Sequence, residues 1–368
     1  KLCIAITASS HLWSLHRGQL QDLMNQGYSI TCISSPGPEH DWLSDIGVNI
    51  KSVSMSRQPD LVKDILSLLR LIWFFMFNRF DIVSFSSPKA SLLVGLASYV
   101  TFQRKKVFTV RGRVYENYKG KKLFFFRAID KTLCFIANSV FAISQELKNN
   151  LINENICAES KVVTIGSGSS NGVDTEKFSL NKHSVKERES IRNSLGILEN
   201  DIVLMYSGRI RKEKGINELI SAYAKLEENR PNTHLLLQGK FELFDLLEPN
   251  TLDYIQKSST IHILDWSDNH ESFYASADLF VFPSYREGFG NALLEAAAMG
   301  LPSIAFDVIG CREAIENNVT GLLCSPRDYE ALYAGIEILL DSPELMTSMG
   351  YNARKRVENH FQQINFWV

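Results

Sequence analysis

PSYREGFGNALLEAAAMGLP, residues 283–302, is the stretch on which the fold assignment depends. It continues an apolar run from Leu279, so a strand, a glycine-rich turn and a helix follow one another. Gly288 and Gly290 allow close backbone approach, and a helix beginning near Asn291 directs free N–H groups and a partial positive charge into the turn. The segment therefore predicts a strand–turn–helix unit that suits an anion.

Two carboxylates flank this turn. Glu287 and Glu295 are separated by seven residues, and at helical rise they lie up to ~12 Å apart. Carboxylates accept hydrogen bonds from neighbouring hydroxyls, so the pair suits a ligand with a sugar at one end, a ribose at the other and a diphosphate between them. The alternative is a solvent-facing pair at an ordinary strand–helix junction.

The same alternation of short apolar runs and helical patterns extends along the whole chain, which predicts an α/β fold of two Rossmann-like, doubly wound domains. In the first half we expect elements at 2–8, 18–25, 28–34, 82–85, 90–100, 106–110, 124–136, 140–143 and 161–165. In the second half we expect them at 202–206, 216–226, 234–238, 261–264, 273–277, 279–283, 292–299, 302–306, 329–340 and 343–359.

The polar stretch 175–200 lacks a sustained apolar face and predicts a domain boundary. We expect a first domain over 1–174, a second over 175–350 and a C-terminal helix within 351–368 that packs toward the first domain. Two similar α/β halves facing each other predict a cleft.

Composition excludes several classes of protein. With 45% hydrophobic and 22% charged residues, the 368-residue chain is an ordinary globular one. The six cysteines show no metal-ligand spacing, and the first residues do not resemble an export signal, so buried, reduced cysteines in the cytoplasm are expected.

Charge is unevenly distributed. Lys and Arg outnumber Asp and Glu by 20 to 13 over residues 1–175 and are outnumbered 19 to 28 afterwards. Between Arg104 and Lys131, ten basic residues face only Glu116 and Asp130, with aromatic residues among them. This stretch suits anionic lipid or a lipid-linked pyrophosphate, against the alternatives of a solvated basic face or a nucleic-acid patch.

Residues 61–77 are too interrupted by charge for a membrane span and suit either an interfacial helix, with Trp73, Phe74 and Phe75 toward lipid, or a core helix.

A second motif, MYSGRIRKEKGINELI at 205–220, predicts a strand, a basic turn and a helix. Its cations suit a departing diphosphate, whereas the alternative is a solvated turn in which Arg211, Lys212 and Lys214 serve only solubility.

Together the two motifs closely resemble the donor-binding segments of family 4 glycosyltransferases, which are retaining enzymes of the GT-B fold. The resemblance implies that Arg209 and Lys214 bind the donor diphosphate, that Glu287 contacts the donor sugar and Glu295 the ribose. It further implies donor contacts from Gly208, Gln238, Gly239, Ile263, Leu264, Gly288, Phe289, Gly290 and Asn291. The strand-end residues among these, Gln238, Gly239, Ile263 and Leu264, are low-specificity matches that equally suit plain strand termini.

The first half departs from the family pattern, since a glycine pair and a histidine are missing from their usual places. ITASSHLWSLHRGQL (6–20) offers Ser9, Ser10, His16 and Arg17 instead, and FTVRGRVYE (108–116) offers Arg111 and Arg113. We expect these residues near the acceptor, with the two arginines on its pyrophosphate or, alternatively, in structural ion pairs.

SSPKASLLVG (86–95), TVRGRVYE (109–116) and GSGSSNGVD (166–174) resemble a subgroup that builds bacterial capsule, O-antigen and glycoprotein glycans. The resemblance implies transfer of an N-acetylhexosamine such as GalNAc or GlcNAc from a UDP-sugar to a polyprenyl-diphosphate saccharide. It also implies a peripheral position at the inner face of the cytoplasmic membrane. Because Asp-x-Asp is absent from the sequence, we expect no metal or other cofactor, and we expect no nucleic-acid partner. The alternatives are a nucleotide-sugar epimerase of similar fold and a non-catalytic scaffold.

Overall fold

The computed structural model describes residues 1–56, 60–113, 115, 118–180, 182, 185–242, 245–267 and 269–366, without the side chains of Arg17 and Val185. The chain forms two compact units, one of residues 1–171 with Phe366 and one of residues 172–365. The division falls three residues before the expected one.

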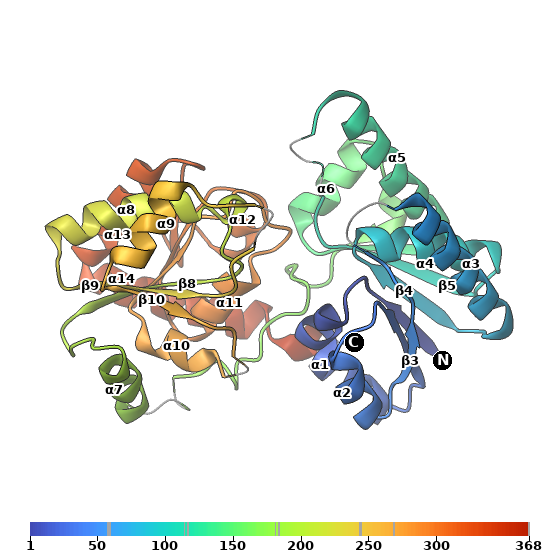
Figure 1. The fold of residues 1–368 in the computed structure, drawn as a ribbon, viewed down its shortest axis with the longest axis horizontal. Coiled ribbons are helices and arrows are strands. Elements are labelled where there is room, and N and C mark those ends of the chain that lie inside the picture. Colours follow the sequence, from blue (N-terminus) through green and yellow to red (C-terminus); the bar gives the residue numbers. More distant parts are fainter. Residues whose placement is uncertain are drawn as a thin grey trace. The chain divides into compact units, whose positions relative to one another are not determined.

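The first unit is built on a parallel sheet of seven strands in the order β3-β2-β1-β4-β5-β6-β7. Helices α1 and α2 cover one face, and α3, α4 and α5 lie side by side on the other (Figure 1). The strands are β1 (Leu2–Ala5), β2 (Ile30–Ser34), β3 (Asn49–Ser52), β4 (Ile82–Ser86), β5 (Lys105–Val110), β6 (Ser139–Ala142) and β7 (Val162–Val163). The helices are α1 (Ser9–Asn25), α2 (Glu39–Asp45), α3 (Leu61–Phe77), α4 (Pro88–Val100), α5 (Gly120–Ile136), α6 (Gln145–Asn153) and the 3₁₀ turn η1 (Glu159–Lys161).

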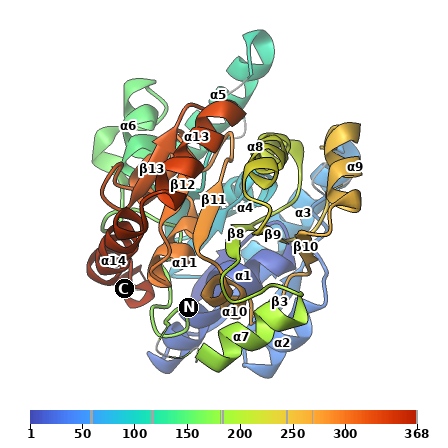
Figure 2. The ribbon, with the colours of Figure 1, turned by 90° about the vertical axis from the view of Figure 1, so that its left-hand side faces the viewer.

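The second unit contains a parallel sheet of six strands, which Figure 2 shows side by side from β13 to β10. Its strands are β8 (Ile202–Ser207), β9 (Thr233–Gln238), β10 (Ile261–Leu264), β11 (Leu279–Phe282), β12 (Ser303–Phe306) and β13 (Gly321–Cys324). Its helices are α7 (Val185–Ser194), η2 (Lys212–Lys214), α8 (Ile216–Asn229), α9 (Pro249–Lys257), α10 (Glu271–Ser276), α11 (Asn291–Ala298), α12 (Cys311–Ala314), α13 (Tyr329–Leu340), α14 (Pro343–His360) and η3 (Gln363–Phe366).

Both sheets confirm the predicted doubly wound α/β architecture. All residues of β11 and β12 are buried, as expected for parallel strands with helices on both faces. Strand order reverses between β1 and β4 in the first sheet and between β8 and β11 in the second. Ligands of such sheets bind beyond the carboxyl ends of the strands at these reversals.

The expected linker 175–200 contains a helix, α7. It is attached through ion pairs, which explains why the sequence shows no apolar periodicity there. Arg188 contacts Oδ1 of Asp278 at 2.7 Å, and the buried Arg192 contacts Oδ2 of the same residue at 2.8 Å. Asp278 precedes β11, so α7 is part of the second unit.

The C-terminal segment 351–368, expected as a helix that packs toward the first domain, is helical as far as His360. Helix α14 packs within the second unit, where Met349, Ala353 and Val357 are buried against α11 and α13. Phe366 is the described residue of this segment that groups with the first unit, and packing of the helix toward that unit stays a prediction.

The basic stretch from Arg104 to Lys131 does not form one surface. Lys106 is buried and donates to the carbonyl of Gln103 at 2.9 Å, and Arg113 is buried as well. Strand β5 separates the exposed Arg104 and Lys105 from the basic start of α5, so the run is divided between opposite ends of the sheet.

Candidate functional site

Three loops meet at the carboxyl ends of β8, β9 and β11. Strand β8 lies between the other two and is parallel to both. The segment from Gly208 to Gly215 follows β8, Gly239 follows β9, and the segment from Pro283 to Gly290 follows β11. The motifs predicted from sequence are therefore neighbours at the strand-order reversal.

Two glycines make this meeting possible. Gly215 has φ of 70°, and a Cβ there would lie 1.8 Å from the carbonyl oxygen of Pro283. A Cβ on Gly239 would lie 1.8 Å from the carbonyl oxygen of Gly208. Side chains are thus excluded where the loops touch, and the amide of Tyr285 donates to the carbonyl of Glu213 at 3.0 Å.

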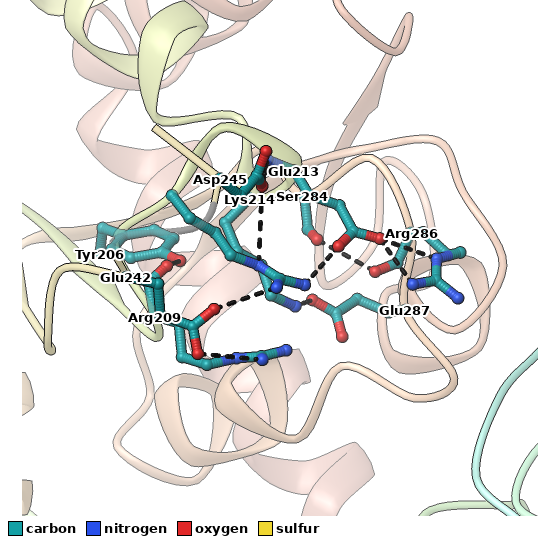
Figure 3. A network of polar contacts seen from close by, with 10 residues as sticks. Tyr206, Arg209, Glu213, Lys214, Glu242, Asp245, Ser284, Arg286 and Glu287 are labelled. Carbon is teal, nitrogen blue, oxygen red and sulfur yellow. Dashed lines mark hydrogen bonds and ion pairs between the residues drawn. The ribbon is translucent and has the colours of Figure 1, made fainter. Parts of the chain in front are cut away.

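The central contact is an ion pair between Lys214 and Glu287, whose Nζ and Oε1 atoms meet directly (Figure 3). Both side chains are largely buried, and the Lys214 Nζ lies 5.9 Å from the centre of the Phe282 ring. Arg209 is half exposed, with its Nη1 3.4 Å from Glu242. The structure thus places one predicted cation against the predicted sugar-binding carboxylate.

Charged residues that sequence reasoning did not select hold these loops. Buried Arg211 contacts Glu213 and reaches Glu242 at 3.0 Å, and Arg286 donates to Glu213 at 2.6 and 2.9 Å (Figure 3). Burial would raise the pKa of Glu213, but Arg286 and Arg211 outweigh it and lower that pKa. Arg211 is therefore not a solvated cation, and the single acidic residue of this basic turn, Glu213, was the available signal.

Glu295 on α11 is held by aromatic neighbours. The Tyr274 hydroxyl donates to its Oε2 at 2.8 Å, and His270 Nε2 lies 3.7 Å from the same oxygen. The imidazole faces the Ser267 carbonyl through Nδ1, at 3.1 Å, and stacks on Trp266 with centroids 4.8 Å apart. Since a carbonyl only accepts, Nδ1 carries a proton, and the contact with Glu295, at 3.7 Å, is an ion pair only when the imidazole is protonated.

The predicted phosphate-binding turn packs against Gly310. Helix α11 begins at Asn291 without a side-chain cap. The amide of Gly290 donates to the Gly310 carbonyl at 3.4 Å, and that of Asn291 to the Phe289 carbonyl at 3.0 Å. Phe289 itself is buried near Phe361. A phosphate bound by the Gly290 and Asn291 amides would therefore have to replace these two backbone contacts.

The low-specificity donor candidates Gln238, Gly239, Ile263 and Leu264 lie at strand ends. Gln238 is fully buried and its Oε1 accepts from Ser207 at 2.9 Å, so its side chain serves the sheet interior. Leu264 accepts a hydrogen bond from the amide of Gly239 at 3.0 Å, and Ile263 is half exposed.

In the first unit, the structure brings His16 and Arg111 together. Arg111 Nη2 lies 3.2 Å from His16 Nε2, and His16 Nδ1 lies 2.7 Å from Gln19. Burial, reinforced by Arg111, lowers the pKa of His16 to about 3, so the imidazole is neutral and accepts from the guanidinium. Burial also lowers the pKa of Arg111 to about 10. Within the described part of the chain, Arg111 Nε and Nη1 are buried without a hydrogen-bond partner.

The other acceptor candidates are arranged differently. Arg113 is buried and its Nη1 lies 2.6 Å from Glu154, which favours the structural alternative. Ser9 and Ser10 begin α1, where the Ser9 hydroxyl donates to Glu39 and Ser10 is exposed. The Arg17 side chain lies outside the described residues. Over the described ranges, no three His, Cys, Asp or Glu side chains gather as metal ligands.

Two doubly wound parallel sheets, with cations and carboxylates gathered where the second sheet reverses its strand order, are the features of a GT-B glycosyltransferase. Comparison with known proteins agrees. Residues 11–177 match the family model described as Glycosyltransferase Family 4, and residues 187–356 match Glycosyl transferases group 1. The chain belongs to the family 4 glycosyltransferases of bacterial capsule and glycan synthesis.

Three relatives illustrate the match. The capsular polysaccharide biosynthesis glycosyltransferase CapM of Staphylococcus aureus is 32% identical over 100% of this chain and 94% of its own length. The UDP-Gal:alpha-D-GlcNAc-diphosphoundecaprenol alpha-1,3-galactosyltransferase of Escherichia coli is 26% identical over 95% of this chain and 90% of its own length. The crystal structure of Anabaena HepE with UDP-glucose has a TM-score of 0.78 at 16% identity and covers 99% of this chain and 96% of its own.

Proposed function

We propose that this glycosyltransferase moves an N-acetylhexosamine, such as GalNAc or GlcNAc, from a UDP-sugar to a polyprenyl-diphosphate-linked saccharide with retention of configuration. The carrying observation is the buried Lys214–Glu287 pair at the strand-order reversal of the second unit. The E. coli relative, named for a UDP-sugar donor and a diphosphoundecaprenol acceptor, supports the choice of substrates.

The donor would replace contacts that the free site makes with itself. Lys214 and Arg209 would turn from Glu287 and Glu242 to the diphosphate, and Glu287 would then accept from the sugar hydroxyls. Glu295, which keeps one carboxylate oxygen outside its contacts with Tyr274 and His270, would accept from the ribose. These exchanges match the charge that a UDP-sugar brings.

In the proposed reaction, an acceptor hydroxyl attacks the anomeric carbon on the face from which UDP departs. The bond from that carbon to the phosphate oxygen breaks, and the same oxygen takes the hydroxyl proton. Arg209 and Lys214 stabilise the negative charge on the departing diphosphate, so that no side-chain base and no metal is required. Such charge stabilisation is effective when the cationic side chains are already held in place before the reaction.

For the acceptor, we propose that Arg111 binds the polyprenyl diphosphate, because two of its buried nitrogen atoms lack partners among the described residues. Anions satisfy such donors through charge-assisted hydrogen bonds. A lipid-linked acceptor would place the enzyme at the inner face of the cytoplasmic membrane, in peripheral contact with anionic lipid. No described helix meets the length and hydropathy that a membrane crossing requires.

The test is a transfer assay with a panel of UDP-sugars and a polyprenyl-diphosphate glycan, read by mass. We expect one added N-acetylhexosamine and UDP release that depends on acceptor. Conversion of the donor sugar without acceptor would instead indicate an epimerase. Transfer from GDP-mannose with no UDP donor active would overturn the nucleotide assignment.

A further inference from the structure

Helix α3 presents a continuous apolar stripe to solvent. Ser67, Leu71 and Phe75, spaced every fourth residue, are its buried side and face the first unit. At about 100° per residue, six exposed apolar side chains fall within an arc of roughly 100° on the opposite side. These six residues, which we call the α3 face, are Val62, Ile65, Leu66, Leu69, Trp73 and Met76.

The exposure of this face is large for such side chains. Val62 is 68% exposed, Leu66 50% and Trp73 64%. A helix at the surface of a globular protein normally has polar residues on its solvent side, and a helix that is apolar on every side is normally buried on every side. The α3 face therefore marks an interaction surface.

A second copy of the chain is a poor occupant. The helix has 17 residues, so it is ~25 Å long and, at a width of ~10 Å, offers roughly 250 Å² per copy. A stable protein interface needs about 800 Å² from each partner. A bilayer surface has no such requirement, since affinity there grows with each apolar side chain inserted.

Charge on the flank of the face favours an anionic partner. Lys63 and Arg70 are seven residues apart and therefore lie on the same flank. Arg70 has no acidic partner in the described part of the chain, and Lys63 pairs only with Asp60, at 3.0 Å. At the other end, Lys51, Trp73, Phe74, Phe77 and Asn78 line a cavity of about 400 Å³, with Lys51 Nζ 5.4 Å from the Phe74 ring centre.

We propose that the α3 face is the membrane-docking surface of this enzyme: the helix lies in the plane of an anionic bilayer with its six apolar side chains inserted and Lys63, Arg70 and Lys51 at the headgroups. Trp73 would sit at the headgroup boundary, where amphipathic rings are favoured. The surface differs from the one expected from sequence, since Phe75 is buried and the basic stretch is divided. The inference rests on the proposed function, because docking at the membrane would bring the enzyme to a lipid-linked acceptor.

The test is co-sedimentation of the full chain with vesicles of phosphatidylcholine mixed with phosphatidylglycerol. The variant L66Q/L69Q/W73Q removes three inserted side chains without touching the buried side of α3. We expect its partition coefficient to fall about tenfold or more. The control L198Q/I338Q/Y351Q changes three exposed apolar residues of the second unit and should bind like the parent chain.

Fluorescence gives an independent measurement. The emission of the parent chain should shift to shorter wavelength on vesicles, and W73F should abolish most of that shift while keeping vesicle binding, because Phe still inserts. Far-ultraviolet circular dichroism checks that each variant is folded.

Three results would overturn the proposal: no binding of the parent chain to the mixed vesicles, unchanged binding of the triple variant, or a dimer in size-exclusion chromatography that the triple variant makes monomeric. Transfer to a water-soluble short-chain acceptor separates this proposal from the proposed function. Activity there without vesicle binding refutes the docking surface alone, whereas vesicle binding without transfer refutes the proposed reaction alone.

Discussion

Lys214 and Glu287 neutralise each other in a largely buried setting, which makes each sensitive to loss of the other. A buried charge without its partner is costly, and a diphosphate needs the same ammonium group. Under the proposed function, the donor diphosphate and sugar would replace this internal ion pair.

Lys214→Ala is expected to lower kcat by about 10²- to 10³-fold, or about 3–4 kcal/mol of transition-state stabilisation, and to weaken UDP binding. Steady-state kinetics and calorimetric titration with UDP provide the measurement. Lys212→Ala is the matched control, because Lys212 lies two residues away in the same turn, is half exposed and pairs with the exposed Glu248, at 3.3 Å. Equal losses of kcat and UDP affinity in both variants would show that the total positive charge of the turn matters, rather than the position of Lys214.

The His270–Glu295 contact predicts a pH dependence of stability. Burial would lower the pKa of His270, but Glu295 outweighs it and raises the pKa above its usual value, while Lys177 opposes this and Tyr274 donates to the same carboxylate. A group with a raised folded pKa stabilises the fold fully below its unfolded pKa and loses that contribution as pH rises through the folded pKa.

We therefore expect the contribution of His270 to the free energy of unfolding to fall as pH rises from about 6.5 through its folded pKa, while His16 and His262, whose pKa values are lowered, contribute with the opposite sign. Urea unfolding across this window measures it. The difference in stability between the parent chain and His270→Gln should shrink as pH rises through this window, whereas the difference for His262→Gln, at a histidine that contacts His234 rather than Glu295, should not. A difference between parent and His270→Gln that stays constant or grows with pH would contradict the contact.

Arg111→Ala is expected to lower kcat/KM for the acceptor by about 10- to 100-fold and to leave UDP affinity unchanged, because two charge-assisted hydrogen bonds to the acceptor diphosphate are lost. Arg104→Ala, at an exposed arginine 3.4 Å from Asp81, is the control from the same basic stretch. An effect on donor rather than acceptor kinetics would remove Arg111 from the acceptor site.

At the scale of elements, the contact between the loops after β8 and β11 depends on the absence of a side chain. Gly215→Ala adds a Cβ within 1.8 Å of a backbone oxygen at φ of 70°, so the loops must separate. We expect loss of UDP binding and a loss of stability of at least about 2 kcal/mol.

Gly196→Ala isolates the effect of backbone conformation, because Gly196 has φ of 73° and nothing within 4 Å of the added Cβ. It should cost only about 1 kcal/mol and leave UDP binding intact. Thermal unfolding with and without UDP compares the two variants, and the same outcome for both would mean that the close approach to Pro283 is unimportant.

At the scale of the whole molecule, the proposed chemistry uses cations supplied by the protein. Transfer activity should therefore persist in excess EDTA and after extensive dialysis against chelator, because Arg209 and Lys214 carry the charge of the leaving diphosphate. A transfer rate that EDTA abolishes and Mg²⁺ or Mn²⁺ restores would refute metal-independent transfer.

Much of the fold could be predicted because parallel strands buried on both faces appear as continuous apolar runs, as in β8, β9 and β11. Short or polar elements could not be predicted this way. Helix α7 is attached through Arg188 and Arg192, and the edge strand β3 has no buried residue, so neither leaves an apolar period in the sequence.

The sequence by itself determined the α/β class, the two repeated halves and the family, because glycine turns, helix starts and charged residues at fixed spacing are local features. Only the tertiary structure decided which charges are partners: Lys214 with Glu287, Arg211 with Glu213 and Glu242, and Arg111 with His16. It also decided that the outer side of α3 is apolar and exposed. Partners come from segments far apart in the chain, and their meeting depends on strand order and loop packing, which no local pattern records.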